Sequence, residues 1–279
     1  MSHTNENFAK LNGTKFYYEV AGGGHPLVLV HAGIADCSMW DEQFQVFAQH
    51  YQVIRYDMRG YGQTALVDGP LVDGPYAHYQ DLNALLDFLG VEQAHVLGCS
   101  LGGTTTLDFA LAYPERVSSL IAVACRPEGY TFQSATPPQF AAMEVAFAAG
   151  DFEQLSELEV QMWVDGPTRT PDQVDARLRD RVRRMNVVAL KNEALELGQP
   201  QPLDPPAAQR LSEIAAPTLV IIGALDRPVM LSAADFMTET IPNVRKVVIE
   251  GTAHLPSMEK PAVFNQAGLD FLGSLPTGN

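Results

Sequence analysis

The chemistry that this sequence can support centres on one serine between two glycines. Ser100 occupies the middle of the run Gly98-Cys99-Ser100-Leu101-Gly102, which has the spacing G-x-S-x-G. The apolar segment 94–97 before it is typical of a buried strand, and 104–113 after it has the composition of a helix. A sharp strand-to-helix turn strains the serine backbone and leaves room only for very small residues two positions away. We therefore predict that Ser100 projects its hydroxyl above a sheet as a nucleophile, next to the free N–H groups of a helix N-terminus.

Two other residues have the chemistry that a serine nucleophile requires. Asp226 follows the apolar run 217–223, and His254 lies in the loop after the apolar run 244–249. Residues just beyond the carboxyl ends of parallel strands meet at one edge of a sheet. A neutral serine hydroxyl is a weak nucleophile, so a histidine must take its proton and an aspartate must orient that histidine. The chain order Ser, Asp, His therefore predicts a catalytic triad of Ser100, Asp226 and His254.

The elements around these residues predict an α/β fold. Short apolar runs alternate with segments of helical periodicity and short turns, which indicates a mostly parallel sheet covered by helices on both faces. An Asn12-Gly13 turn before the β-rich segment 14–20 adds a hairpin at the start. The predicted strands are 26–30, 52–56, 94–97, 117–124, 217–223 and 244–249, and the predicted helices are 41–49, 79–89, 104–113 and 261–272.

The alternation stops between 126 and 213. This stretch has only helical segments and proline-rich joints, so we predict an inserted helical cap at 126–213, with the core formed by 1–125 and 214–279. Asp151 is a predicted helix N-cap. Thr170-Pro171-Asp172-Gln173 combines a cap, an N1 proline and an N3 glutamine, and predicts a helix that runs to Leu197 before Gly198.

Arginines provide candidate charges near the predicted site. Arg126 follows the strand 117–124 and could hold a substrate carboxylate, or it could pair with Glu128 or another acid. His31, at the end of the strand 26–30, could act as a ligand or base, but we interpret it as bonded to its own loop. A basic cluster in the predicted cap could recruit substrate, but we interpret it as a solvated face paired with carboxylates. The cluster consists of Arg177, Arg179, Arg181, Arg183 and Arg184.

Composition limits the function classes. The chain has 279 residues, 46% of them hydrophobic, enough to bury one large core. A net charge of −15 and a pI of about 4.7 disfavour nucleic-acid and anionic-membrane partners. Three cysteines without C-x-x-C spacing, a polar segment 1–10 and the lack of a membrane-length apolar run predict a soluble, cytoplasmic protein. Leu-Val-Asp-Gly-Pro occurs twice in succession, at 66–70 and 71–75, and predicts a surface turn of unknown function.

The motifs together resemble the α/β-hydrolase superfamily over nearly the whole chain. They comprise the serine turn, the segment 57–62 (Asp-Met-Arg-Gly-Tyr-Gly), the Gly223–Asp226 run and the Gly251–His254 loop. The runs Ser38-Met39-Trp40-Asp41-Glu42-Gln43 and Arg55-Tyr56-Asp57-Met58-Arg59-Gly60 are similar to 3-oxoadipate enol-lactonases and related esterases. A serine at the nucleophile position distinguishes the chain from epoxide hydrolases and haloalkane dehalogenases. A resemblance to those enzymes would imply an aspartate at this position.

The resemblance also implies an oxyanion hole. In this superfamily the second donor comes from the loop after the strand 26–30, so the backbone N–H groups of Gly33 and Leu101 are the implied donors. The common form of that loop is His-Gly-x, whereas this chain has Ala32 there, and Ile34 is an alternative donor. Ile34, Arg126 and Trp163 are our candidates for contacts with the substrate.

The expected function is that of a serine hydrolase acting on a small ester or lactone, without metal or organic cofactor. A carbon–carbon hydrolase of a vinylogous diketone could use the same triad, and a non-catalytic receptor or scaffold with this fold is a third hypothesis. The sequence does not specify the substrate or the oligomeric state.

Overall fold

The computed structural model describes residues 5–66, 74–133, 137, 139–195 and 198–275. Its centre is an eight-stranded sheet with the order β1-β2-β4-β3-β6-β7-β9-β10. β2 pairs antiparallel with β1 and β4, and the remaining neighbours are parallel, as expected for an α/β sheet. The strands are Asn5–Leu11 (β1), Thr14–Gly22 (β2), Pro26–Val30 (β3), Gln52–Tyr56 (β4), Ala94–Cys99 (β6), Val117–Val123 (β7), Thr218–Gly223 (β9) and Val244–Ile249 (β10).

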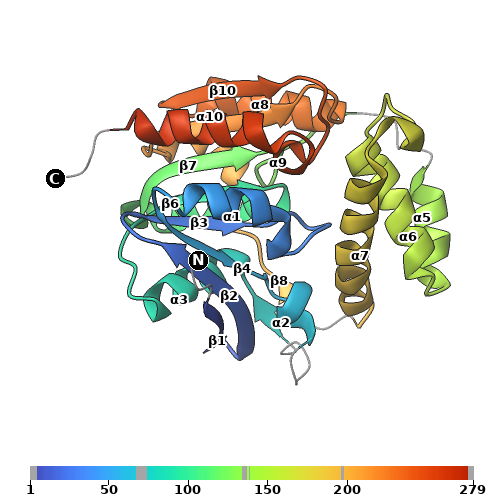
Figure 1. Cartoon of the computed structure of the whole chain (residues 1–279), viewed down its shortest axis with the longest axis horizontal. Helices are drawn as coiled ribbons and strands as arrows, with labels where there is room; N and C mark the ends of the chain where they lie inside the picture. The colour runs from blue at the N-terminus through green and yellow to red at the C-terminus, as the bar shows by residue number, and fades with distance from the viewer. Residues whose placement is uncertain (1–4, 67–73, 134–136, 138, 196–197, 276–279) are drawn as a thin grey trace.

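Helices cover both faces of this sheet. In Figure 1, α1 and α10 lie in front of the sheet and pack against each other, whereas α4 and α8 lie behind it. The helices of the core are Asp41–Phe47 (α1), Gly62–Leu66 (α2), His78–Phe88 (α3), Leu101–Ala112 (α4), Pro228–Thr240 (α8), Pro256–Glu259 (α9) and Pro261–Gly273 (α10). Short 3-10 turns occupy Cys37–Trp40, Pro114–Arg116, Pro171–Gln173, Ala207–Gln209 and Leu211–Glu213.

The uninterrupted apolar runs of the sequence form the middle of the sheet. Every residue of β6 and β9 is buried, because parallel strands with helices on both faces have no solvent side. The hairpin between β1 and β2 turns at Asn12 and Gly13, whose φ angles of 46° and 76° fit a type I′ turn. β6, which leads to Ser100, therefore lies near the centre of the sheet, with β3 and β7 as neighbours.

A second layer of helices interrupts the sheet between β7 and β9. It contains Gln139–Ala148 (α5), Phe152–Val160 (α6), a π-helical turn at Gln161–Asp165 and Ala176–Glu193 (α7). Figure 1 shows α7 nearest to the core, with α5 and α6 beyond it. Two short strands, Pro75–Tyr76 (β5) and Gln199–Pro200 (β8), pair in parallel, and Figure 1 shows β8 on the core side of α7, near α2.

One predicted helix differs from the structure. The segment that begins at Thr170 forms only the 3-10 turn Pro171–Gln173, although the Gln173 side chain does accept a hydrogen bond from the Thr170 N–H. Val174 is extended, and the Asp175 carboxylate caps a new helix, α7, which ends at Glu193. The prediction of a single helix up to Leu197 was therefore wrong, because a second N-cap five residues later outcompetes the first. Asp151 does cap α6, as predicted.

Three further expectations concern individual segments. Cys37, Cys99 and Cys125 are free and buried. No helix in the described ranges has the length and apolar character needed to cross a membrane. The duplicated Leu-Val-Asp-Gly-Pro turn falls mainly on 67–73, outside the described residues.

Candidate active site

The turn at Ser100 has the strained geometry that the sequence predicts. Ser100 has φ 54° and ψ −117° and stands at the N-terminus of α4. A Cβ on Gly98 would lie 2.2 Å from the Gly102 carbonyl oxygen, and one on Gly102 would lie 2.3 Å from that of Val30. Larger residues cannot occupy these positions without displacing backbone, so the glycines are what permits the turn. α4 begins at Leu101, three residues earlier than predicted.

The structure brings Ser100, Asp226 and His254 together. His254 Nε2 lies 2.9 Å from Ser100 Oγ, and His254 Nδ1 lies 2.9 Å from Asp226 Oδ2. The other carboxylate oxygen of Asp226 accepts a hydrogen bond of 2.7 Å from the Arg227 N–H. Asp226 and His254 are only 3% and 2% exposed, so water competes little for these bonds. A carboxylate at Nδ1 places the imidazole proton there, and Nε2 is then free to accept the serine proton.

The predicted oxyanion residues are also neighbours. A Cβ on Gly33 would lie 3.5 Å from Leu101 Cβ, so the loop after β3 approaches the first residue of α4. His31 supports this loop, because its Nδ1 donates to the Ala32 carbonyl (2.8 Å) and its Nε2 accepts from the Met58 N–H (2.9 Å). Burial lowers the pKa of His31 to about 4, so this imidazole is neutral. The interpretation of His31 as a loop-bonding residue is confirmed.

The turn 57–62 has a structural role. The Asp57 carboxylate accepts from the N–H groups of Cys37 (2.7 Å) and Gln63 (2.7 Å), and so joins the oxyanion loop to the turn after β4. Arg59 forms a bidentate ion pair with Asp81 on α3. Both side chains are thereby used to hold backbone segments in place.

A cavity of about 420 Å³ opens beside the oxyanion residues. Gly33, Ile34 and Leu101 form its wall on the core side, and residues of α6 and α7 form the opposite wall. Such a space between a nucleophile turn and a covering helical layer is where a small substrate would lie. Its polar lining includes Tyr61, His78, Glu159, Asn186 and Glu193.

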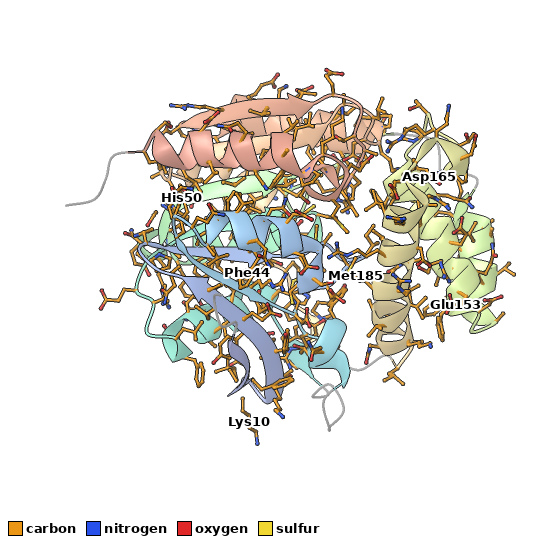
Figure 2. All side chains as sticks on the ribbon, viewed as in Figure 1. Lys10, Phe44, His50, Glu153, Asp165 and Met185 are labelled. Carbon is orange, nitrogen blue, oxygen red and sulfur yellow. The ribbon has the colours of Figure 1, made fainter. Side chains whose placement is uncertain are left out.

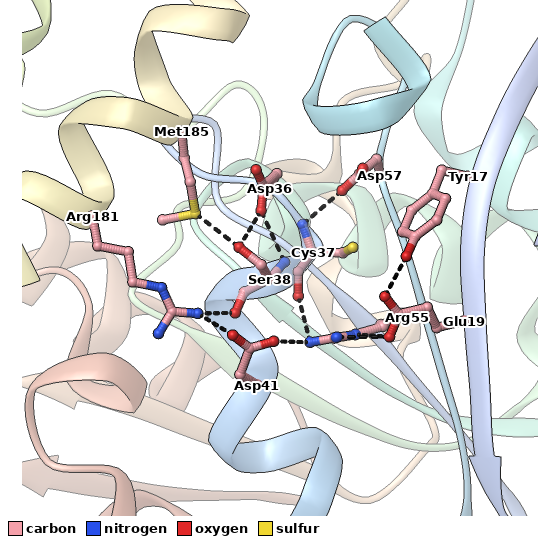
Figure 3. Close-up of polar contacts among 10 residues, drawn as sticks. All are labelled: Tyr17, Glu19, Asp36, Cys37, Ser38, Asp41, Arg55, Asp57, Arg181 and Met185. Atoms are coloured by element: carbon pink, nitrogen blue, oxygen red, sulfur yellow. Dashed lines mark hydrogen bonds and ion pairs between the residues drawn. The ribbon is translucent and has the colours of Figure 1, made fainter. Parts of the chain in front are cut away.

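The helical layer is fastened to the oxyanion loop through α7 (Figure 3). Arg181 forms an ion pair of 2.6 Å with Asp41 and donates to the Ser38 carbonyl. The Ser38 hydroxyl donates to Asp36 at 2.5 Å and lies 3.3 Å from Met185 Sδ, and Figure 2 shows Met185 on the side of α7 that faces the core. Asp41 in turn accepts from Arg55 at 2.6 Å. Asp41, which follows the segment of Ser38, is therefore held by one arginine from the helical layer and one from the core.

The arginine cluster of this layer is largely paired with carboxylates. Arg179 bonds Asp165 (2.8 Å) and Glu157 (2.6 Å), and Arg181 bonds Asp41. Arg183 pairs with Glu153 and Asp180, and Arg184 pairs with Asp180. Arg177 is exposed and has no ion pair within the described ranges. The predicted pairing with carboxylates is confirmed for the other four arginines, but Arg179 is largely buried against Asp165 and does not lie on a solvated face.

Trp163 contacts His254 of the predicted triad directly. Its ring lies 4.4 Å from that of His254 between centroids, and its carbonyl accepts a hydrogen bond of 3.2 Å from the His254 N–H. The Arg227 guanidinium lies 4.8 Å from the indole centroid. The π-helical turn Gln161–Asp165 carries Trp163, and π-helical turns occur often at functional sites. Sequence periodicity gives no signal for such a turn.

A buried ion pair behind Trp163 was missed by sequence analysis. Arg169 donates to the carbonyls of Val164 (2.6 Å) and Asp165 (2.8 Å) and bonds Glu259 at 2.7 Å. The other oxygen of Glu259 accepts from the N–H of Ala253, the residue before His254. This pair links the π-helical turn to the histidine loop. Nothing in the spacing of Arg169 and Glu259 indicates their contact.

Arg126 lies at the predicted edge of the sheet, with its side chain exposed. Its carbonyl accepts a hydrogen bond of 2.9 Å from Thr104 Oγ1, one helical turn after Ser100. No ion pair joins Arg126 to Glu128 in the part of the chain that is described. Burial lowers the pKa of Arg227, and the nearby charge of Arg126 lowers it further. The two guanidinium groups are therefore close enough for their charges to interact.

The fold and this site define an α/β hydrolase. Residues 25–261 match the family described as alpha/beta hydrolase fold, so the chain belongs to this family of hydrolytic enzymes. It is 31% identical over 274 residues to the 2-hydroxy-6-oxononadienedioate/2-hydroxy-6-oxononatrienedioate hydrolase of Paraburkholderia phymatum, covering 92% of this chain and 90% of that protein. It is 29% identical to the pimeloyl-[acyl-carrier protein] methyl ester esterase of Aeromonas hydrophila, covering 90% and 97%. The crystal structure of the enol-lactonase from Burkholderia xenovorans superposes with a TM-score of 0.76 at 22% identity, over 96% of this chain and 100% of that one, and confirms the fold.

Proposed function

We propose that this enzyme cleaves a small carboxylic ester or lactone through an acyl-enzyme on Ser100. The observation that carries the proposal is the 2.9 Å contact of His254 Nε2 with the strained Ser100, with Asp226 at 2.9 Å on the other imidazole nitrogen. In this arrangement Ser100 attacks, His254 transfers the proton, and Asp226 orients His254 and stabilises its charged form.

The reaction proceeds in two halves. Ser100 Oγ attacks the substrate carbonyl while its proton moves to His254 Nε2, and the backbone N–H groups of Gly33 and Leu101 receive the oxyanion, with Ile34 as the alternative to Gly33. His254 then protonates the leaving alcohol. A water molecule, activated by the same nitrogen, attacks the acyl-enzyme and releases the acid. No metal or organic cofactor is needed for these steps.

The helical layer has the role of a cap in this proposal. We assign the cap to 126–213 and the core to 1–125 and 214–279, because the layer forms one wall of the cavity beside Gly33. Ile34 and Arg126 are proposed substrate contacts, together with Trp163. The three free thiols support a reducing, cytoplasmic location. The partner is a small molecule and neither a nucleic acid nor a membrane.

Relatives support a second candidate, hydrolysis of a carbon–carbon bond. The Paraburkholderia relative and a 29% identical relative from Comamonas testosteroni are hydrolases named for 2-hydroxy-6-oxo dienoates. The same triad could act on a vinylogous diketone. A screen of p-nitrophenyl esters, lactones and ring-cleavage diketones separates the two candidates, and labelling of Ser100 by a fluorophosphonate tests the nucleophile that they share. Absence of labelling and of turnover for every class would instead favour a non-catalytic receptor or scaffold.

A further inference from the structure

We infer that the cavity beside the oxyanion loop selects substrates whose acyl chain ends in a hydrogen-bond donor, best an ammonium group, and disfavours chains that end in a carboxylate. The inference rests on the proposed function, because it concerns the group attached to the carbonyl that Ser100 attacks. Gly33 and Leu101 line this cavity, so an acyl group whose oxygen is held by them extends into it.

Glu159 provides a fixed acceptor on the far wall of the cavity. Its Oε2 accepts a hydrogen bond of 2.6 Å from Asn186 Nδ2, and the same Asn186 nitrogen lies 3.2 Å from Ser156 Oγ. Asn186 is 1% exposed, so it holds the carboxylate in one orientation. Within the described ranges, Oε1 of Glu159 has no hydrogen-bond partner. A preoriented carboxylate with a free oxygen is a strong acceptor for a donor group of the substrate.

A second carboxylate, Glu193 near the end of α7, lines the same cavity. Burial raises the pKa of Glu159, and the neighbouring Glu193 charge raises it further, while the Asn186 bond opposes both. Burial likewise raises the pKa of Tyr61, helped by Glu193, Tyr76 and Glu159, so both carboxylates act on the wall that holds Tyr61. The cavity is therefore an acidic environment at the position of a bound acyl chain.

The cations of the lining cannot offset these charges. Arg59 is the one arginine among the described lining residues. Its charge is neutralised by a bidentate ion pair with Asp81, at 2.9 Å and 3.0 Å, and its side chain is 2% exposed. Burial lowers the pKa of His78 to about 4, so this imidazole is neutral, and its buried Nδ1 has no partner in the described part of the chain. Neither carboxylate forms an ion pair with a described lysine or arginine.

The charge of this cavity disfavours a substrate whose acyl chain ends in a carboxylate. Charges of like sign repel one another, and they do so more strongly in a cavity that excludes much of the water. A terminal carboxylate in the cavity would meet Glu159 and Glu193 without a compensating cation. The Paraburkholderia relative is named for a dioate, whereas this cavity fits a chain that ends in an ammonium group.

The inference is tested with length-matched p-nitrophenyl esters of heptanoate, 6-aminohexanoate and adipate, which end in a methyl, an ammonium and a carboxylate. We expect kcat/KM for the ammonium ester to exceed that for the carboxylate ester by about tenfold or more in the wild type. Glu159→Gln keeps the shape and an oxygen for Asn186, so it should lower the ammonium value about tenfold, raise the carboxylate value several-fold and leave the heptanoate value within about twofold.

Glu153→Gln is the matched control, because Glu153 lies on α6 like Glu159 but does not line the cavity. Glu153 pairs with Arg183, and Figure 2 labels it on the outer side of the helical layer. It should leave the preference unchanged. The heptanoate ester reports the triad by itself, so loss of all ester turnover would contradict the proposed function and not only the selectivity. Wild-type preference for the carboxylate ester, or equal effects of Glu159→Gln on all three esters, would overturn the inference.

Discussion

The indole of Trp163 lies against the imidazole of His254, 4.4 Å between ring centroids, and its carbonyl accepts the His254 N–H at 3.2 Å. The same segment also approaches the loop of Asp226, because a Cβ on Gly166 (φ 76°) would lie 2.8 Å from the Leu225 carbonyl oxygen. A turn of the helical layer is thus packed on two loops of the core that carry the proposed triad. The layer therefore does more than cover the cavity, since it also fixes the orientation of His254.

Trp163→Ala should lower kcat on a neutral ester by about ten- to a hundredfold, because a misplaced base transfers the proton poorly. If positioning is its main role, KM should change little, and Trp163→Phe should restore much of kcat. Steady-state kinetics of both variants on p-nitrophenyl butanoate measure this. A rise in KM with kcat unchanged would instead show that Trp163 contacts the substrate and does not position His254.

Removal of the nucleophile gives a second prediction. Ser100→Ala should abolish covalent labelling by a fluorophosphonate and lower ester turnover by several orders of magnitude. Asp226→Asn should also be severe, on the order of 10⁴ in kcat, because an amide favours the wrong imidazole tautomer. Intact-mass spectrometry after labelling and initial rates measure the two effects. Activity like that of the wild type in either variant would refute the assigned triad.

Asp108 should make a contribution to the folding stability that falls as the pH rises from about 4 to about 7. Burial raises the pKa of this carboxyl on α4 to about 7. The charge of Glu128 raises this pKa further, whereas the Leu203 N–H and Arg210 lower it. The Oδ1 of Asp108 has no hydrogen-bond partner within the described ranges. The unfolded aspartate has a pKa near 3.9, so in this pH range the folded chain keeps a proton that the unfolded chain has released.

Asp108→Asn should remove this pH dependence. We expect the variant to be more stable than the wild type at pH 8, by on the order of 2 kcal/mol, and similar to it at pH 4. Urea unfolding at both pH values measures the difference. An equal change in the free energy of unfolding at pH 4 and pH 8 would show that the carboxyl does not titrate in this range.

Features that the local sequence determines could be predicted, whereas features that depend on contacts between distant segments could not. Ser100, Asp226 and His254 could be placed because each follows its own strand, and strand ends meet at one sheet edge whatever the rest of the chain does. The predicted start of α7 was wrong because Val174 is extended and Asp175 caps the helix, so two competing capping signals lie five residues apart. The charge of the cavity could not be predicted, because Glu159 and Glu193 meet Tyr61 only through the packing of the helical layer on the core.

Arg126 gives the last prediction, which concerns the leaving group. Its guanidinium is exposed, unpaired with Glu128 within the described ranges, and close enough for its charge to lower the pKa of Arg227 beside Trp163. His254 protonates the leaving alcohol, so this group lies on the side of Trp163 and the two arginines, away from the acidic cavity. A carboxylate on the alcohol could therefore be held by Arg126 as a planar, bidentate partner.

The test compares 4-nitrophenyl butanoate with 3-carboxy-4-nitrophenyl butanoate, which differ by one carboxylate on the leaving group. Arg126→Met should lower kcat/KM for the carboxylated ester about thirtyfold more than for the neutral one, which corresponds to about 2 kcal/mol, the scale of a lost charged hydrogen bond. Arg177→Met, on an exposed arginine without an ion pair in the described residues, is the control and should affect both esters equally. Equal losses for Arg126→Met, or none, would leave Arg126 with a structural role and favour a substrate with a neutral leaving group.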